Sequence, residues 1–292
     1  MRFFIHCCMF IFLLYSGQFS AFSQSMKYAD SLYLSGNYYE AAIEYERVVF
    51  LARDAQLTSQ ALMKKTQCQK QQFQFDEAYK TLIRIPVSAQ SESFIRRVDY
   101  EKALCCYLAH RPVDALQILH RLNGEAEDTA LLIKSYLVQI LAYSEIREWD
   151  EARRICSQRW IPLLSRDKSK VDSLQHICDA LFDESNRPEL LDIKKAKRRS
   201  LLCPGLGLIY AGKTGEGLLN VAIQASFIYL GIVQWQQQFY LSAYFFGVSL
   251  WHRFYLGGAR RAIYQCEKQN AEMLKKFETE VKKCLLQINS WK

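Results

Sequence analysis

Glycine and proline are scarce in this chain, with 12 and 5 copies among 292 residues. Both residues interrupt helices, so their scarcity leaves room for long helical segments. Apolar and polar residues almost never alternate with a period of two between Ser25 and Ala196, which argues against half-buried strands there. Hydrophobic residues make up 50% of the chain, enough for a buried core. The sequence therefore predicts an all-α protein of one or two domains.

Motifs that carry chemistry are also missing. The chain has five histidines, and none stands in a motif with a serine or cysteine nucleophile. No Cys-x-x-Cys pair or Cys/His cluster has the spacing of a zinc site. The acidic pairs Asp76-Glu77 and Asp150-Glu151 recur at one phase of a repeat, and solvated first turns of helices explain them better than catalysis. We therefore predict no enzyme, no catalytic residue, no cofactor and no metal site.

What the chain does contain is a repeat. Four alanines stand at equal intervals of 37 residues (78 − 41 = 37, and likewise for the next two), and an acidic residue precedes each. They are Ala41, Ala78, Ala115 and Ala152, with a ring three positions earlier in Tyr38, Phe75, Pro112 and Trp149, and with Tyr45, Leu82, Leu119 and Cys156 four positions later. A fixed period between 20 and 50 residues indicates a stacked array of supersecondary units.

The spacing has a physical reason. An alanine lets two crossing helices approach closely, and the residues three before and four after it share its face of the helix. The pattern resembles the second helix of the tetratricopeptide repeat, and the resemblance covers Ser25 to Ile161. It implies stacked helical hairpins that hold a protein or peptide partner, with units longer than the family's usual length of about 34 residues. The alternative is a set of unrelated helical hairpins spaced by chance.

The first copy of the repeat is the clearest. One helix is expected to end at Gly36 and the next to begin at Tyr38, while Phe73, His110 and Arg147 replace the turn glycine in later copies. We place the array in residues 24–190.

Residues 1–23 form a predicted secretory signal. Arg2 gives a positive start, Phe3 to Tyr15 an apolar stretch, and Ala21 and Ser23 provide small residues before a cut ahead of Gln24. The alternative is an uncleaved anchor helix, although the apolar stretch is short for that role. The signal predicts export of the array.

Eight cysteines follow the predicted signal, and export would permit disulfides among them. They are scattered and mostly occupy helix-core positions, in a chain too long to need a disulfide framework. We therefore expect small buried hydrophobes rather than bridges.

The formal charge of +8 is concentrated in two clusters, one within Lys194–Arg199 and one formed by Arg253, Arg260 and Arg261. Both flank apolar segments, which favours lipid headgroups over nucleic acid as the partner. The positive-inside tendency would place these clusters in the cytoplasm. We give the export signal precedence because long translocated domains largely ignore loop charge.

Between the clusters lies a predicted membrane hairpin in residues 218–258. Leu218 to Trp235 contains no charged residue and would span roughly 27 Å as a helix, about the thickness of a hydrocarbon core. Phe239 to Leu256 is the second apolar segment, with Gln236–Gln238 as the turn. The alternative is a buried pair of helices in a soluble domain.

A glycine-rich motif precedes the hairpin, within a basic juxtamembrane segment of residues 191–217. Gly207 to Thr214 matches the phosphate-binding loop G-x-x-x-x-G-K-T. We reject nucleotide binding because no strand can precede the motif, a membrane segment follows it, and no aspartate occurs after Asp192 to hold magnesium.

The motif instead resembles the start of a two-helix membrane module found at the end of many bacterial proteins. The matching residues are Pro204, Gly205, Gly207, Tyr210, Gly212, Lys213 and Gly217. Leu208 departs from the pattern, which often has a polar residue there. The resemblance runs from Leu201 to about Asn270 and implies a membrane location without any chemistry.

Residues 259–292 form a predicted amphipathic helix, which could lie on the membrane, pack on the array or self-associate. Taken together, these features predict a bacterial cell-envelope protein in the inner membrane with its repeat array on the periplasmic side. Its expected role is to hold an unidentified protein or peptide partner. The alternative is an accessory component of a membrane transport or insertion machine in which the hairpin is the active part.

Overall fold

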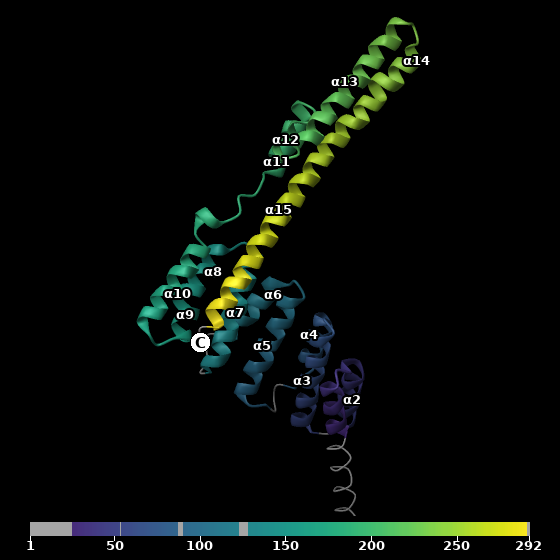
Figure 1. Ribbon diagram of the computed structural model, residues 1–292. Coiled ribbons are helices and arrows are strands. Elements are labelled where there is room, and N and C mark those ends of the chain that lie inside the picture. Colours follow the sequence, from purple (N-terminus) through teal and green to yellow (C-terminus); the bar gives the residue numbers. More distant parts are fainter. Residues whose placement is uncertain (1–24, 53, 87–89, 123–127, 291–292) are drawn as a thin grey trace, which may run out of the picture. The chain divides into compact units, whose positions relative to one another are not determined.

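The computed structural model describes residues 25–52, 54–86, 90–122 and 128–290 (Figure 1). All regular structure in these residues is helical, which confirms the all-α prediction. The chain divides into two compact units, residues 1–182 with 284–292 and residues 183–283, which are described separately below. The predicted signal segment lies outside the described residues.

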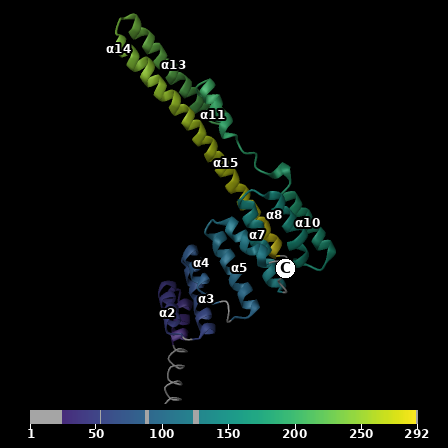
Figure 2. The same ribbon diagram turned by 180° about the vertical axis from the view of Figure 1, so that it is seen from behind.

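The first unit is a succession of helices that pack consecutively, from α2 on α3 through to α7 on α8 (Figures 1 and 2). A helix at residues 25–34 precedes them. The elements are α2 (Tyr38–Leu51), α3 (Ala55–Gln71), α4 (Phe75–Ile83), α5 (Glu92–Leu108), α6 (Pro112–Leu122), α7 (Thr129–Glu145), α8 (Trp149–Ile155), the π-helical η2 (Cys156–Trp160), α9 (Ile161–Leu164) and α10 (Lys168–Leu181).

The 37-residue period of the sequence reappears in the backbone of the turns. Gly36, Phe73, His110 and Arg147 all adopt left-handed conformations, with φ of 83°, 59°, 56° and 69°. In each turn the next amide donates to a carbonyl five residues earlier, as Asn37 does to Leu32 and Glu148 to Tyr143. This is the Schellman bond that ends a helix. The next helix then begins at the ring of the repeat, at Tyr38, Phe75, Pro112 or Trp149.

Helix starts and buried positions follow the same period. The side chains of Asp54, Ser91 and Asp128 accept backbone hydrogen bonds at the N-termini of α3, α5 and α7, again 37 residues apart (91 − 54 and 128 − 91). Such caps satisfy amides that have no partner within the helix. The burial pattern also repeats, because the four repeat alanines have no exposed surface. The same is true of Ala29, Thr66, Ala103 and Ile140 on the preceding helices.

The left-handed turn positions yield a prediction. A non-glycine residue in this conformation costs about 1–2 kcal/mol, and Arg147→Gly removes that cost. Glycine also increases the conformational entropy of the unfolded chain, which offsets part of the gain, so we expect the free energy of unfolding to rise by about 0.5–1 kcal/mol. Gly36→Ala should lower it by about 1 kcal/mol, although a Cβ at Gly36 would meet no atom within 4 Å. Urea unfolding of the detergent-solubilised chain measures both. If Arg147→Gly and Gly36→Ala changed the free energy of unfolding by the same amount in the same direction, the turn assignment would be contradicted.

One cysteine pair corrects the expectation of buried thiols. Cys156 and Cys178 form a disulfide with Cα atoms 6.7 Å apart, and it links η2 to α10. Both side chains are fully buried. The disulfide was not predicted from the sequence, because Cys156 occupies the packing position that Tyr45, Leu82 and Leu119 hold in the earlier copies. Cys68 and Cys105 are buried without a bridge, and burial raises their pKa values to about 11 and about 12.

The second unit contains η3 (Glu184–Asn186), α11 (Ile193–Leu202), α12 (Leu206–Tyr210), α13 (Thr214–Gln236), α14 (Tyr240–Ala243), the π-helical η4 (Tyr244–Leu250) and most of α15 (Trp251–Ser290). Helix α13 packs against α14 and η4 as an antiparallel hairpin (Figure 1). Its backbone crosses η4 very closely, because a Cβ built on Gly231 would lie 2.6 Å from the Cα of Gly247.

By length and composition, α13 is the one helix among the described residues that could cross a membrane. The second predicted span, Phe239 to Leu256, is helical but divided among α14, η4 and the start of α15. The amphipathic segment predicted from residue 259 forms the later part of α15. The end of α15 belongs to the first unit, and Leu285 and Ile288 are buried there.

Candidate functional site

The repeat residues predicted from the sequence build a scaffold rather than a site. The four alanines, Tyr45, Leu82 and Leu119 are buried, and the rings at Tyr38, Phe75, Pro112 and Trp149 are partly buried. The surface of these helices that is open to contact therefore consists of other side chains.

An open groove of about 540 Å³ lies along α2, α3 and the start of α4. It is lined by Tyr39, Ala42, Ile43, Glu46, Arg47, Phe50, Lys65, Gln69, Gln72 and Gln74. Tyr39, Ile43 and Phe50 are 65%, 46% and 87% exposed. We did not predict these three residues as a site from the sequence. Their spacing along α2, four residues from Tyr39 to Ile43 and seven from Ile43 to Phe50, nevertheless indicates a second apolar stripe beside the buried one.

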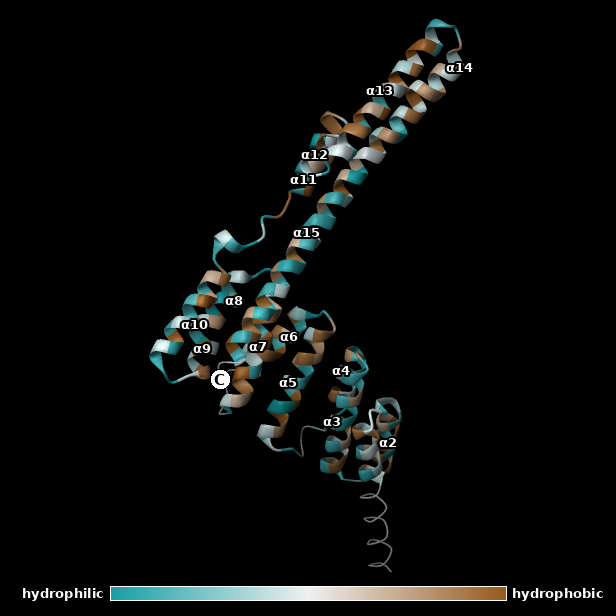
Figure 3. Cartoon of the chain, viewed as in Figure 1, coloured by the Kyte–Doolittle hydropathy of each residue, from teal (hydrophilic) through white to brown (hydrophobic). Residues whose placement is uncertain are grey.

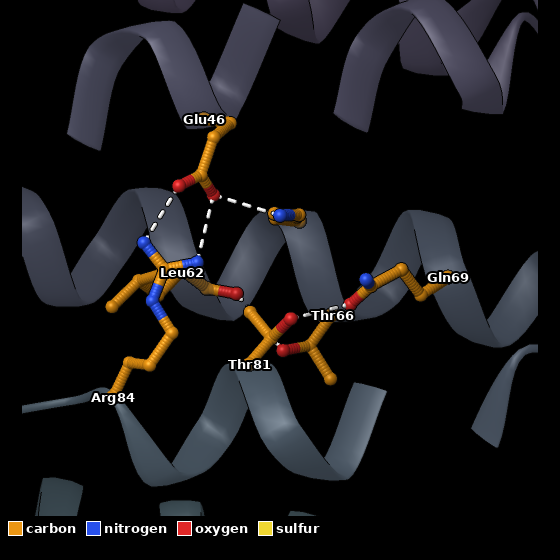
Figure 4. A network of polar contacts seen from close by, with 7 residues as sticks. Glu46, Leu62, Thr66, Gln69, Thr81 and Arg84 are labelled. Carbon is orange, nitrogen blue, oxygen red and sulfur yellow. Dashed lines mark hydrogen bonds and ion pairs between the residues drawn. The ribbon is translucent and has the colours of Figure 1, made fainter. Parts of the chain in front are cut away.

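An ion-pair network fixes the polar side of this groove (Figure 4). Arg84 donates two hydrogen bonds to the Glu46 carboxylate, of 2.6 and 3.0 Å, and Lys65 donates a third of 2.7 Å. Beside it, Thr81 donates to Gln69 at 2.9 Å. The network joins α2, α3 and the end of α4 along one side of the groove.

The ionisation of Glu46 should make the stability of the first unit depend on pH. The hydrogen bonds from Arg84, followed by those from Lys65, lower the pKa of its carboxyl from 4.5 to about 2. A lowered native pKa stabilises the fold above the unfolded pKa, and this stabilisation disappears as the pH falls from about 4.5 to about 2.

We therefore expect the stability difference between the natural chain and Glu46→Gln to be largest above about pH 5 and to shrink toward about pH 2. Thermal melts across this pH range measure the difference. Glu40→Gln on the same helix is the matched control, because Glu40 forms no ion pair among the described residues. A difference for Glu46→Gln that stays constant with pH would contradict the network.

In the second unit, the structure explains the glycines of the membrane-module motif by close packing. Gly205 has φ of 84°, and a Cβ there would lie 2.3 Å from the carbonyl oxygen of Gly217. A Cβ on Gly207 would lie 2.0 Å from the Ser200 hydroxyl oxygen and 3.0 Å from the Ala262 Cβ. Gly212 has φ of 70°. The motif therefore lets α11, α12 and α13 fold back on one another beside α15.

The same segment lacks the architecture of a phosphate loop. A helix, α11, precedes the motif where a phosphate loop has a strand. The backbone amides of the motif donate to carbonyls of the motif itself: those of Leu208 and Ile209 donate to Gly205, and that of Lys213 donates to Leu208. A phosphate loop needs such amides directed at the ligand. Lys213 is the cap residue of α13 and is exposed.

Two cations of α11 lie near the ring of Tyr210. The Arg199 guanidinium lies 4.6 Å and the Lys195 ammonium 5.7 Å from the centre of its ring. The Tyr210 hydroxyl accepts a hydrogen bond from the backbone amide of Asp192 at 3.2 Å. Pro204, which starts the motif, is partly buried. This arrangement fixes α11 against the motif.

No family model matches this chain, and no curated protein or solved structure is significantly similar to it. In the part of the chain that the structure describes, no three His, Cys, Asp or Glu side chains gather where they could hold a metal ion. The surfaces that remain to be assigned are the α2–α3 groove and the apolar hairpin.

Proposed function

We propose that this protein is a non-catalytic scaffold that holds a protein or peptide partner at a membrane. The observation that carries the proposal is a recurrence at 37 residues, of the turns and buried positions four times and of the helix caps three times, combined with an exposed apolar helical hairpin. The recurrence supports a solenoid of hairpins similar to tetratricopeptide repeats, whose units bury their faces on one another. Such arrays present extended surfaces, and the α2–α3 groove is our candidate for partner contact.

The membrane assignment is supported by the exposure of the hairpin. Leu218, Leu219, Tyr229 and Trp235 of α13 are 60% or more exposed, and Leu241 of α14 is 86% exposed. Figure 3 shows apolar residues along much of α13. An apolar surface of this kind requires a covering, and lipid covers both helices at once. We place the hairpin in the inner membrane of a bacterium and the array on the exported side.

Site-specific photo-crosslinking tests the proposal. A photoreactive amino acid at Ile43 in the groove should yield a discrete protein adduct in cells, whereas the same group at exposed Lys170 on α10 should not. The adduct should disappear in Phe50→Asp, which places a charge in the groove. Equal adducts from Ile43 and Lys170, or none from either, would contradict a partner site in the groove.

The alternative role, in a transport or insertion machine, is favoured by one feature of the hairpin. Gln224 is 2% exposed, and its amide donates to Asn220 at 2.7 Å. Its carbonyl oxygen is buried and accepts no hydrogen bond in the described residues. Polar groups inside a membrane often mark a transport path. Gln224→Leu should leave the Ile43 adduct intact if the protein is a scaffold. If the hairpin is the active part, the Gln224→Leu chain should fail to replace the natural chain in cells that lack it.

A further inference from the structure

Helix α11 carries five cations without acidic partners. We call this set, Lys194, Lys195, Lys197, Arg198 and Arg199, the α11 cations. All five are exposed, and none forms an ion pair with a carboxylate in the described part of the chain. Asp192 caps the helix through the backbone amides of Lys194 and Lys195 instead. The opposite face of α11 is fixed, because Ala196 and Ser200 are buried.

Contacts within the second unit set the level of these charges relative to the hairpin. Leu191 exchanges two hydrogen bonds with Asn270, Ala196 packs with Cys266, and the Tyr255 hydroxyl donates to the Leu201 carbonyl. Helix α11 therefore runs antiparallel to α15. Its cations lie at the level of Arg260 and the residues after it, and its C-terminal end points toward the apolar part of the hairpin.

Three helices change from charge to apolar surface at this level. In α11 the cations are followed by Leu201 and Leu202, which are 39% and 86% exposed. In α13, Lys213 and Glu216 precede Leu218 and Leu219. In α15, Arg260 and Arg261 adjoin exposed Leu256. Glu216 pairs with Arg261 at 3.0 Å, and Asp192 and Glu267 are two further carboxylates near Cys266. The five α11 cations together with Lys213 and Arg260 outnumber these carboxylates, so the charge at this level is positive.

We infer that this surface binds the phosphates of anionic phospholipids in the leaflet at the base of the hairpin. The inference rests on the proposed membrane hairpin, since exposed leucines in three helices would place the cations at headgroup depth. Charge complementarity favours anionic over zwitterionic lipid. Tyr210, held by Arg199 and Lys195, adds an amphipathic ring at the same depth. Arg253, further along the hairpin, can reach this level with its long side chain.

The test measures lipid retained by the full chain in mild detergent after addition of phosphatidylglycerol and phosphatidylcholine in equal amounts. We expect several-fold more phosphatidylglycerol to be retained. Lys197→Gln with Arg198→Gln should lower this preference by several-fold, toward equal retention of the two lipids, because two of the charges that favour the anionic headgroup are removed. These two residues are chosen because neither contacts Tyr210 within the distances given above. Lys275→Gln with Lys276→Gln, on exposed positions of α15, is the control with the same charge change.

The outcomes separate the two proposals. If the natural chain is extracted from membranes by alkaline carbonate, the membrane hairpin itself is wrong. If the chain resists carbonate but retains both lipids equally, or if the control pair lowers the preference as much as the α11 pair, the lipid inference alone is overturned. Inorganic phosphate should displace phosphatidylglycerol no better than chloride at equal ionic strength, and specific displacement by phosphate would identify a soluble anion as the ligand.

Discussion

Ala115→Leu will lower the free energy of unfolding by about 1–3 kcal/mol, because extra methyl groups at a fully buried crossing force the backbones apart. Ala115 has no exposed surface and belongs to a cluster with Ala103, Cys106 and Val138 from the neighbouring helices. The same substitution at Ala41 should have a similar cost, since it occupies the equivalent position of the first copy. Urea unfolding of the detergent-solubilised chain, followed by circular dichroism, measures both.

Gln117→Leu is the matched control for this prediction. It introduces the same side chain in the same helix, at an exposed position two residues away. We expect a change within about 0.5 kcal/mol, as is usual for surface substitutions. If Ala115→Leu and Ala41→Leu together cost no more than Gln117→Leu, the alanines do not mark helix crossings and the repeat interpretation fails.

Reduction of the Cys156–Cys178 disulfide is expected to have the second large effect. The bridge joins residues 22 apart in sequence, and a loop of that length restricts the unfolded chain by about 3 kcal/mol. Unfolding with and without a reductant should therefore differ by about this amount. Cys156→Ser with Cys178→Ser should be insensitive to the reductant, whereas Cys203→Ser, which alters an exposed cysteine without a bridge, should keep the full sensitivity.

The redox state of this pair also bears on location. Disulfides persist in exported proteins and are rare in the cytosol. When free thiols are alkylated at the moment of lysis, Cys156 and Cys178 should remain unmodified because they are joined in the disulfide. Complete alkylation of both would place the first unit in a reducing compartment and would contradict export.

Much of the first unit could be predicted from sequence because its pattern is local. The ring, alanine and apolar residue of each copy lie within eight positions, on one helix in the first three copies and on α8 and the start of η2 in the fourth, and each helix starts at the predicted ring. The left-handed turns at Phe73, His110 and Arg147 could be placed only by comparison with Gly36, since residues other than glycine adopt that conformation uncommonly, histidine more often than phenylalanine or arginine. The disulfide depends on the path of α10, which no local pattern encodes.

The candidate surfaces were less predictable. The groove depends on which residues of α2 remain uncovered after packing, and Tyr39 and Phe50 resemble core residues in the sequence. The ion pair between Glu46 and Arg84 joins residues 38 apart on different helices. In the second unit the glycine motif was recognisable, but its packing against Ser200, Gly217 and Ala262 required the fold.

The central claim is that an exported helical array is held at the membrane by its own hairpin. One labelling experiment tests both parts, using Asn37→Cys at the exposed first turn in a chain whose Cys203 and Cys284 are replaced by serine. Spheroplasts are treated with a membrane-impermeant maleimide, and the membranes are then washed with alkaline carbonate. We predict labelled protein in the carbonate-resistant membrane fraction without prior lysis. Labelling at Asn37 only after lysis, or release of the protein by carbonate, would contradict the account.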